Sequence, residues 1–326
     1  MVGTTNAPDG LRVGITLPTL GELKHRGLGA GTVTGTLAGG IATAARHVEQ
    51  LGLESVWVPD LIIGDGTAAL EATTVVAAAA AVTERVLVGF GVYILPLRPV
   101  AWTAAQIQTL QHLSGNRVVL GVGAGGFPGS PFWRAVDGPS DQRFRRTDDA
   151  LDLLPGLIAG EPMSIGPGDE PLVTLAPAAP VPPILFGGNS EGAIRRVARR
   201  DIGWFPSLLT ADDLRARIAP LRELRAQRGG PAPAVTVGGH AMIGSEAEVR
   251  PTREIFVRGL VDAYRLPMEQ ATAVPVHGSV SAVTERLASY AEAGAQRVVL
   301  ALDGEDWMRQ AELLATARSA LAGSRR

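Results

Sequence analysis

Short runs of β-branched residues alternate with longer stretches rich in alanine, leucine and arginine along almost the whole chain. The expected strands are residues 11–17, 55–59, 86–94, 117–122, 183–186, 202–205, 234–243 and 297–302. The expected helices are residues 33–51, 68–82, 100–113, 143–159, 190–199, 210–228, 247–264, 280–293 and 307–322. Strands that alternate with helices are typical of parallel βαβ units, and eight such units in a row predict a single (β/α)8 TIM barrel of the α/β class.

A doubly wound open sheet is the alternative fold, but no boundary in composition interrupts the eight units. Insertions are expected after the first strand, after the fourth strand (residues 123–142), and between the fourth helix and the fifth strand. The last of these, residues 161–182, is rich in proline and glycine and could form a small hairpin. We expect residues 1–10 to be a flexible N-terminus and residues 11–326 to form one domain.

The composition excludes several classes of protein. The chain has no cysteine, which excludes disulfides, thiolate nucleophiles and iron–sulfur clusters. A net charge of −2 argues against a nucleic-acid partner, and no apolar stretch is long enough to span a membrane. No histidines and carboxylates have the spacing of metal ligands, so no metal is predicted. We therefore expect a cytoplasmic protein that acts on a small molecule.

Two glycine-rich segments follow expected strands, where the active site of a barrel lies. The segment from Gly121 to Gly126 has the GxGxxG pattern, but the residues after it, Phe-Pro-Gly-Ser-Pro, cannot open the helix that a dinucleotide fingerprint requires. We interpret it as a backbone surface for a flat ring, or as glycines that a wide turn needs. The segment from Phe186 to Ser190 joins a strand to a helix. Its free N–H groups predict a phosphate site, or simple helix capping.

Asp60 follows the second expected strand and could act as acid or base, orient a substrate, or accept a hydrogen bond from a ring N–H. Capping of its neighbours is the alternative. His25, in the loop after the first strand, could donate a proton or be a solvated surface residue.

Several blocks of sequence together resemble the luciferase-like monooxygenase superfamily. They are Val13-Gly-Ile-Thr-Leu-Pro18, Leu51 to Asp60, Leu95-Pro-Leu-Arg98, Leu113 to Gly123, Phe186 to Ser190 and Asp201-Ile-Gly-Trp204. The resemblance runs from about residue 11 to residue 302 and so covers nearly the whole chain.

This resemblance implies a barrel that binds FMN or the deazaflavin coenzyme F-420. The cofactor ring would rest near the ends of the third and fourth strands, and its phosphate would lie at the end of the fifth. Such enzymes often carry a non-prolyl cis peptide at the position of Gly91–Val92. The resemblance implies a set of cofactor-binding residues at these strand ends: Gly91, Val92, Gly123, Ala124, Gly125, Gly187, Gly188, Asn189 and Ser190. Asp60 is a further candidate for contact with the cofactor.

The chain also departs from the family's dehydrogenases. Leu61 follows Asp60 where many of them have histidine, and Gly126 and Phe127 stand where they often have glutamate. An alcohol- or sugar-oxidising mechanism is therefore not expected. The predicted function is transfer of a hydride from reduced coenzyme F-420 to an activated C=C or C=N bond of a small organic substrate.

Three further expectations concern the residues that would serve this reaction. The proton would come from Tyr93, His25 or a bound water, and Asp60 would orient the ring or the substrate. Aromatic side chains could wall an apolar substrate pocket or belong to the core; they are Trp57, Phe127 and Trp133.

Two alternatives to the reductase remain open. They are a monooxygenase that uses reduced FMN and oxygen, and a non-catalytic flavin-binding barrel. The resemblance also implies a homodimer, for which the helices 68–82 and 100–113 are candidates, and a separate flavin or deazaflavin reductase that supplies reduced cofactor.

Overall fold

A single curled sheet of parallel strands lies at the centre of the molecule, in the order β6-β5-β4-β3-β2-β1-β9-β7-β8. The computed structural model describes residues 10–19, 40–61, 68–126, 129–138, 140–166, 171–304 and 306–323. Within them the strands are β1 Arg12–Thr16, β2 Ser55–Val58, β3 Leu87–Ile94, β4 Val118–Gly123, β5 Ile184–Gly187, β6 Gly203–Phe205, β7 Thr236–Ile243, β8 Val276–Gly278 and β9 Arg297–Leu302.

The two ends of the strand series meet. Isolated parallel bridges join Trp204 to Val235 and Ser207 to Gly238, and so bring β6 beside β7. Since β7 pairs with β9 and β9 pairs with β1, strands β1–β7 and β9 run around a TIM-barrel-like fold. The short β8 pairs with the end of β7 alone.

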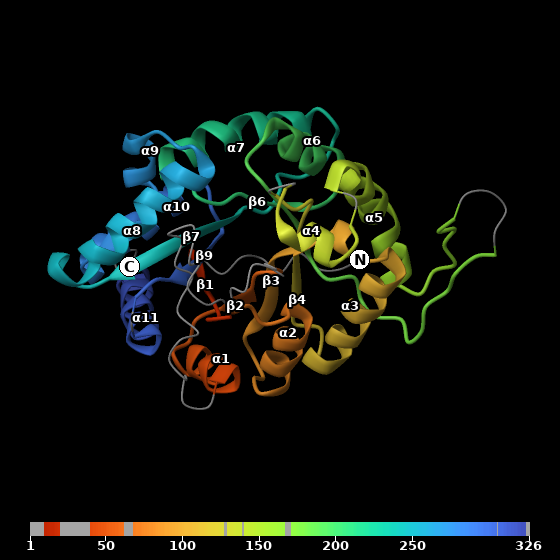
Figure 1. The fold of residues 1–326 in the computed structure, drawn as a ribbon, viewed down its shortest axis with the longest axis horizontal. Coiled ribbons are helices and arrows are strands. Elements are labelled where there is room, and N and C mark those ends of the chain that lie inside the picture. Colours follow the sequence, from red (N-terminus) through yellow and green to blue (C-terminus); the bar gives the residue numbers. More distant parts are fainter. Residues whose placement is uncertain are drawn as a thin grey trace.

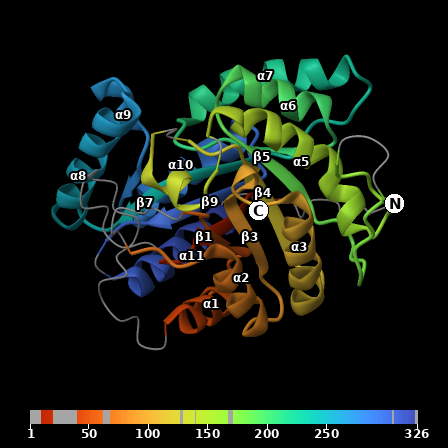
Figure 2. The same cartoon turned by 45° about the vertical axis from the view of Figure 1, so that its right-hand side comes forward.

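Helices cover the outside of the sheet (Figures 1 and 2). They are α1 Gly40–Gln50, α2 Ala72–Ala81, α3 Val100–Ser114, α4 Pro131–Ala135, α5 Arg143–Ile158, α6 Glu191–Arg199, α7 Ala211–Ala226, α8 Glu246–Tyr264, α9 Met268–Ala273, α10 Val280–Glu292 and α11 Trp307–Gly323. In both views α8 and α9 lie at the opposite end of the molecule from α3. Among the described residues, no helix is long and apolar enough to cross a membrane.

Side chains that alternate along each strand divide into two apolar layers. Outward-facing residues such as Val13 and Ile15 join the large core between sheet and helices. Inward-facing residues fill the barrel; they are Trp57, Val119, Leu185, Phe205 and Val299.

Glycines on neighbouring strands make room for the indole of Trp57. A Cβ built on Gly14 would lie 2.7 Å from its Nε1 atom, and one built on Gly89 would lie 2.7 Å from its ring. The absence of a side chain at these two glycines therefore leaves room for one large ring at the barrel axis.

Helix ends explain most differences between expected and observed boundaries. The helix expected from residue 68 begins at Ala72, because Glu71 caps it by accepting hydrogen bonds from the N–H groups of Thr73 and Thr74. The capping expected at Thr210 is confirmed, since its hydroxyl oxygen accepts the Asp213 N–H at 3.1 Å.

Three short elements are missing from the sequence prediction. They are α4, within what was expected to be an uninterrupted loop, and α9 and β8, between the helices expected at 247–264 and 280–293. Each is too short to show a hydrophobic period. In the excursion before β5, Met163 and Val173 form an antiparallel bridge, as the hairpin interpretation expects.

Candidate active site

The carboxyl ends of β3, β4 and β5 meet around the side chain of Val92. The Gly91–Val92 peptide is cis, as the family resemblance implies. A Cβ on Gly123 would lie 2.8 Å from Val92 Cγ2, and a Cβ on Gly187 would lie 3.0 Å from Val92 Cγ1. The two glycines therefore leave room for the half-buried side chain of Val92. At this end of the sheet the isopropyl group of Val92 covers the backbone of both glycines.

The loop after β4 is closed by an apolar cluster. Ala124 is buried, and Gly125 has a φ of +76°. A Cβ on Gly125 would lie 2.8 Å from the Trp133 ring, which packs with Phe132 and donates its Nε1–H to Gly126 O at 3.2 Å. Trp133, expected to wall a substrate pocket, thus packs as a buried part of this cluster.

The segment from Gly187 to Ser190 connects β5 to the N-terminus of α6, as expected. Ser190 caps the helix by accepting the Ala193 N–H at 3.2 Å. Gly188 has a φ of +124°, which favours glycine, and its carbonyl accepts the indole N–H of Trp204 at 2.9 Å. The N–H groups of the first helical turn have no acceptor within the helix, so they point a positive potential at this end of β5.

Two further contacts hold this loop in place. Asn189 bonds both backbone groups of Ser207, donating to its carbonyl at 2.7 Å and accepting its N–H at 3.2 Å. Arg217, on α7, donates to the Asn189 carbonyl at 2.8 Å. A half-buried guanidinium therefore stands beside the start of α6. Sequence reasoning missed Arg217, because nothing in the α7 sequence signals its approach to a loop 28 residues away.

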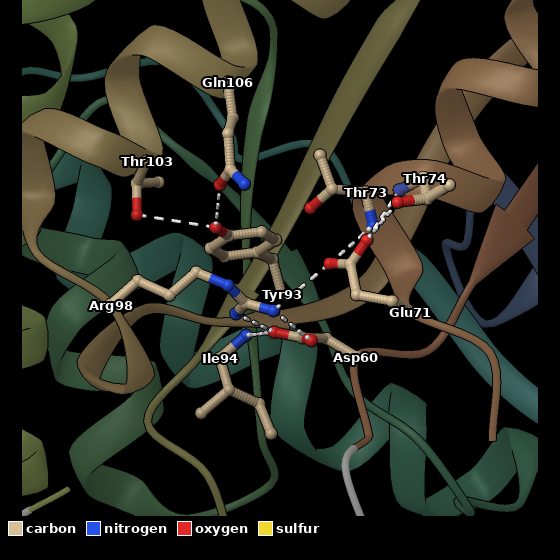
Figure 3. A network of polar contacts seen from close by, with 9 residues as sticks. All are labelled: Asp60, Glu71, Thr73, Thr74, Tyr93, Ile94, Arg98, Thr103 and Gln106. Carbon is tan, nitrogen blue, oxygen red and sulfur yellow. Dashed lines mark hydrogen bonds and ion pairs between the residues drawn. The ribbon is translucent and has the colours of Figure 1, made fainter. Parts of the chain in front are cut away.

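Both oxygens of the Asp60 carboxylate are engaged in an ion pair, so the carboxylate is not free (Figure 3). Arg98 donates to both oxygens, at 2.7 and 2.9 Å, and the Ile94 N–H donates to Oδ2 at 2.9 Å. The Glu71 carboxylate lies 3.5 Å from Arg98. Burial alone would lower the pKa of Arg98, but the hydrogen bonds to Asp60 raise it above its usual value. The ion pair fastens the end of β2 to the turn after β3.

Tyr93 packs against this ion pair and has no exposed surface. Its hydroxyl donates to Gln106 Oε1 at 2.8 Å, and the Arg98 guanidinium lies 4.5 Å from its ring centre (Figure 3). Burial raises the pKa of Tyr93 to about 12. The side chain therefore holds its proton firmly, on the helix side of β3.

Three other candidates have different outcomes. Trp57 is fully buried, meets the Phe205 ring edge-on at 5.3 Å and donates its Nε1–H to Ser55 Oγ at 2.7 Å. It forms part of the barrel filling below the carboxyl ends. His25 and Phe127 lie outside the described residues.

A histidine–carboxylate pair at the carboxyl ends of β7 and β9 was not singled out from the sequence. His240 Nδ1 lies 2.8 Å from Asp303 Oδ2. The two residues are 63 positions apart, so only the fold brings them together.

The family of the chain follows from comparison with known proteins. The family model described as luciferase-like monooxygenase matches residues 26–325. The chain belongs to this family, whose members are flavin- or deazaflavin-dependent oxidoreductases, and it is an enzyme of that class.

Proteins with similar sequences include the following two. An uncharacterised protein of Mycobacterium tuberculosis is 33% identical over 211 residues, covering 58% of this chain and 72% of the relative. The 4-hydroxyprotoasukamycin monooxygenase of Streptomyces nodosus is 34% identical over 117 residues, covering 36% of this chain and 31% of the relative.

Solved structures that share the fold include the following three. A monooxygenase from Streptomyces bottropensis, RslO1, has a TM-score of 0.77 at 15% identity, covering 96% of this chain and 100% of its own. An F-420-dependent secondary alcohol dehydrogenase in complex with an F-420–acetone adduct has a TM-score of 0.76 at 16% identity, covering 95% and 99%. The oxygenating constituent of 3,6-diketocamphane monooxygenase from Pseudomonas putida, in complex with FMN, has a TM-score of 0.72 at 17% identity, covering 95% and 98%.

Proposed function

We propose that this enzyme uses reduced coenzyme F-420 to transfer a hydride to an activated C=C or C=N bond of a small organic substrate. The observation that carries the cofactor assignment is the donor set at the end of β5. It combines the first-turn N–H groups of α6 with the Arg217 guanidinium, beside a loop whose Gly188 has a positive φ. Such donors fit a phosphate group, which FMN and F-420 both carry.

The cofactor ring would rest against Val92 on β3, two strands away from the phosphate loop that follows β5. When bound, the reduced cofactor supplies the hydride. The protein's own residues orient the ring: Gly123 and Gly187 seat Val92, and the Asp60–Arg98 ion pair fixes the turn after β3. Asp60 is thus proposed as a positioning residue.

The engagement of Asp60 argues against this residue as the base of an alcohol oxidation. Oxidation of an alcohol needs a base to accept the hydroxyl proton. Both Asp60 oxygens already accept hydrogen bonds from Arg98, so this carboxylate is poorly placed as a base. Reduction of a double bond needs a hydride and a proton, and no free carboxylate.

A monooxygenase that uses reduced FMN and oxygen is the second candidate. The name of the Streptomyces nodosus relative, a monooxygenase, favours it. The same phosphate donors and the same Val92 surface would serve FMN. A separate reductase would supply reduced cofactor in either case.

Two assays distinguish the candidates. The first follows anaerobic oxidation of reduced F-420 with 2-cyclohexen-1-one, an activated C=C compound, as the probe. The second measures oxygen uptake with reduced FMN, with and without protein. The proposal predicts catalysed F-420 oxidation that depends on the enone. Enzyme-dependent oxygen chemistry with FMN alone would support the monooxygenase, and no effect in either assay would support a binding protein without this catalysis.

We also infer a homodimer that packs through α3. Two large apolar side chains on this helix are exposed, Trp102 by 64% and Leu113 by 55%. They are eleven residues apart, about three helical turns, and so lie on one face. Sedimentation of the wild type should give a dimer, and Trp102→Glu should give a monomer with an unchanged circular dichroism spectrum. A monomeric wild type would refute this inference.

A further inference from the structure

We infer that His240, held by Asp303, is the proton donor to the substrate; this inference deepens the proposed function and rests on it.

His240 lies on the inner face of β7, near its carboxyl end. Outward-facing Val237 and Ala241 belong to the core beneath the helices. Gly238 faces inward, since a Cβ built there would lie 3.1 Å from the Phe205 ring inside the barrel. Because side chains alternate along a strand, His240 faces the same way as Gly238, one layer closer to the carboxyl ends.

The ring of strands places β7 opposite β3. Counted through β4, β5 and β6, or through β2, β1 and β9, β7 is the fourth strand from β3. His240 therefore stands across the end of the barrel from Gly91–Val92. A cofactor ring that rests on Val92 would turn its other face toward the side of the barrel from which His240 projects.

Asp303 determines which imidazole nitrogen is free. The His240 Nδ1–H donates to Asp303 Oδ2 at 2.8 Å, and the Asp303 N–H donates to Ala241 O at 2.9 Å, which ties the carboxylate to β7. The Phe256 ring lies 4.5 Å from the imidazole and restricts its rotation. Within the described part of the chain, Nε2 has no hydrogen-bond partner. Nε2 is therefore the atom that can give up or accept a proton.

Asp303 is almost completely buried at its contact with His240. The residue is only 3% exposed, and burial raises the pKa of its carboxyl group. Its Oδ1 atom is buried and accepts no hydrogen bond from the described residues. Among the described residues, His240 is the side chain that contacts this buried carboxylate, so the position of the imidazole depends on Asp303.

The proposed step transfers one hydride and one proton to the substrate. A hydride from the reduced cofactor forms a new bond to one atom of the substrate C=C or C=N, and the π electrons move to the other atom. His240 Nε2–H transfers its proton to that second atom. The substrate gains one hydride, which carries the two electrons that the cofactor loses, and one proton from His240. His240 is left neutral until solvent water returns the proton.

Chemical modification tests the position of His240 independently of turnover. Diethyl pyrocarbonate acylates accessible imidazole nitrogens, and peptide mass spectrometry can separate the five histidines of the chain. Protein is modified with and without oxidised F-420 or FMN at about ten times the measured Kd, where about nine-tenths of the sites are filled. We expect modification of His240 to slow about tenfold. The control is His112, which is exposed on α3 and should react at an unchanged rate.

The outcomes separate this inference from the proposed function. If cofactor binds but does not change the rate at His240, the inference is overturned and the proposed function stands. If neither cofactor binds, the proposed function fails and this inference fails with it. Protection of His240 alone supports both.

Variants test the chemical role. His240→Gln should bind cofactor within about twofold of wild type, yet slow enone-dependent oxidation of bound reduced F-420 by about 10²–10⁴-fold at unchanged KM. Asp303→Asn should give a comparable loss in kcat and shift the ¹⁵N resonances of His240 toward the Nε2–H tautomer, a change that a purely structural residue would not cause. His112→Gln is the matched control. If His240→Gln turns over at the wild-type rate with cofactor bound, the inference is wrong.

Discussion

Asp60 and Tyr93 show how burial decides what a polar residue does. Both were candidates for acid–base chemistry because they lie at the carboxyl ends of expected strands, Asp60 just after one and Tyr93 within the last residues of another. In the structure, Asp60 is saturated by Arg98 and the Ile94 N–H, and Tyr93 is enclosed with Gln106. Their sequence positions were predictable, but their partners were not, because Arg98 lies 38 residues from Asp60.

Asp60→Asn should destabilise the fold substantially. The change leaves the largely buried Arg98 guanidinium without its bidentate partner, which typically costs about 3 kcal/mol in the free energy of unfolding. Urea unfolding at pH 7 measures the loss. Asp212→Asn, which removes an exposed ion pair with Arg215 at 2.5 Å, is the control and should change stability by less than about 1 kcal/mol. Equal effects of the two substitutions would contradict the assignment.

Tyr93 should make stability depend on pH in the alkaline range. Its pKa is near 10 when unfolded and about 12 in the folded protein. Between these values the unfolded state has lost the proton that the folded state keeps, so stability falls as pH rises, by up to about 1.4 kcal/mol per unit. Urea midpoints from pH 9 to 11.5 should fall less steeply for Tyr93→Phe. Tyr290, whose pKa burial also raises, keeps its own contribution. Identical pH slopes for Tyr93→Phe and the wild type would refute the raised pKa of Tyr93.

At the scale of elements, the strand–helix junction at Ser190 was well predicted and the glycine segment after β4 only partly. Ser190 caps α6 as its residue type suggests. Gly123 was expected to expose backbone, whereas it makes room for Val92 from the neighbouring strand. A contact of this kind depends on the register between β3 and β4, which no local pattern encodes.

Gly123→Ala should therefore disturb the ring surface without unfolding the chain. Its Cβ would lie 2.8 Å from Val92 Cγ2, and overpacking of this kind costs about 1–3 kcal/mol. Thermal unfolding and cofactor titration measure the effects on stability and on affinity. Gly126→Ala is the matched control, because a Cβ there meets nothing within 4 Å. Wild-type affinity and stability in Gly123→Ala would contradict the packing described.

The alternation of strands and helices was sufficient to predict the architecture of the whole molecule. Eight of the strands were expected within a few residues of their observed bounds, because each carries an apolar run flanked by turn residues. The site could not be predicted as fully. His240 and Asp303 are brought together by the pairing of β7 with β9, and Arg217 reaches the loop after β5 because α7 packs beside α6.

The central claim is that a flavin-type cofactor binds here with its phosphate at the start of α6. Side-by-side fluorescence titration of the purified protein with oxidised F-420 and FMN tests it, with Arg217→Gln as the site variant and the exposed Arg215→Gln as the control. We expect saturable binding, selective for F-420, that Arg217→Gln weakens about 10- to 100-fold, as the loss of a charged hydrogen bond predicts. Arg215→Gln should bind as the wild type does. Failure to bind either cofactor, or equal affinity of the Arg217→Gln variant, would contradict the account.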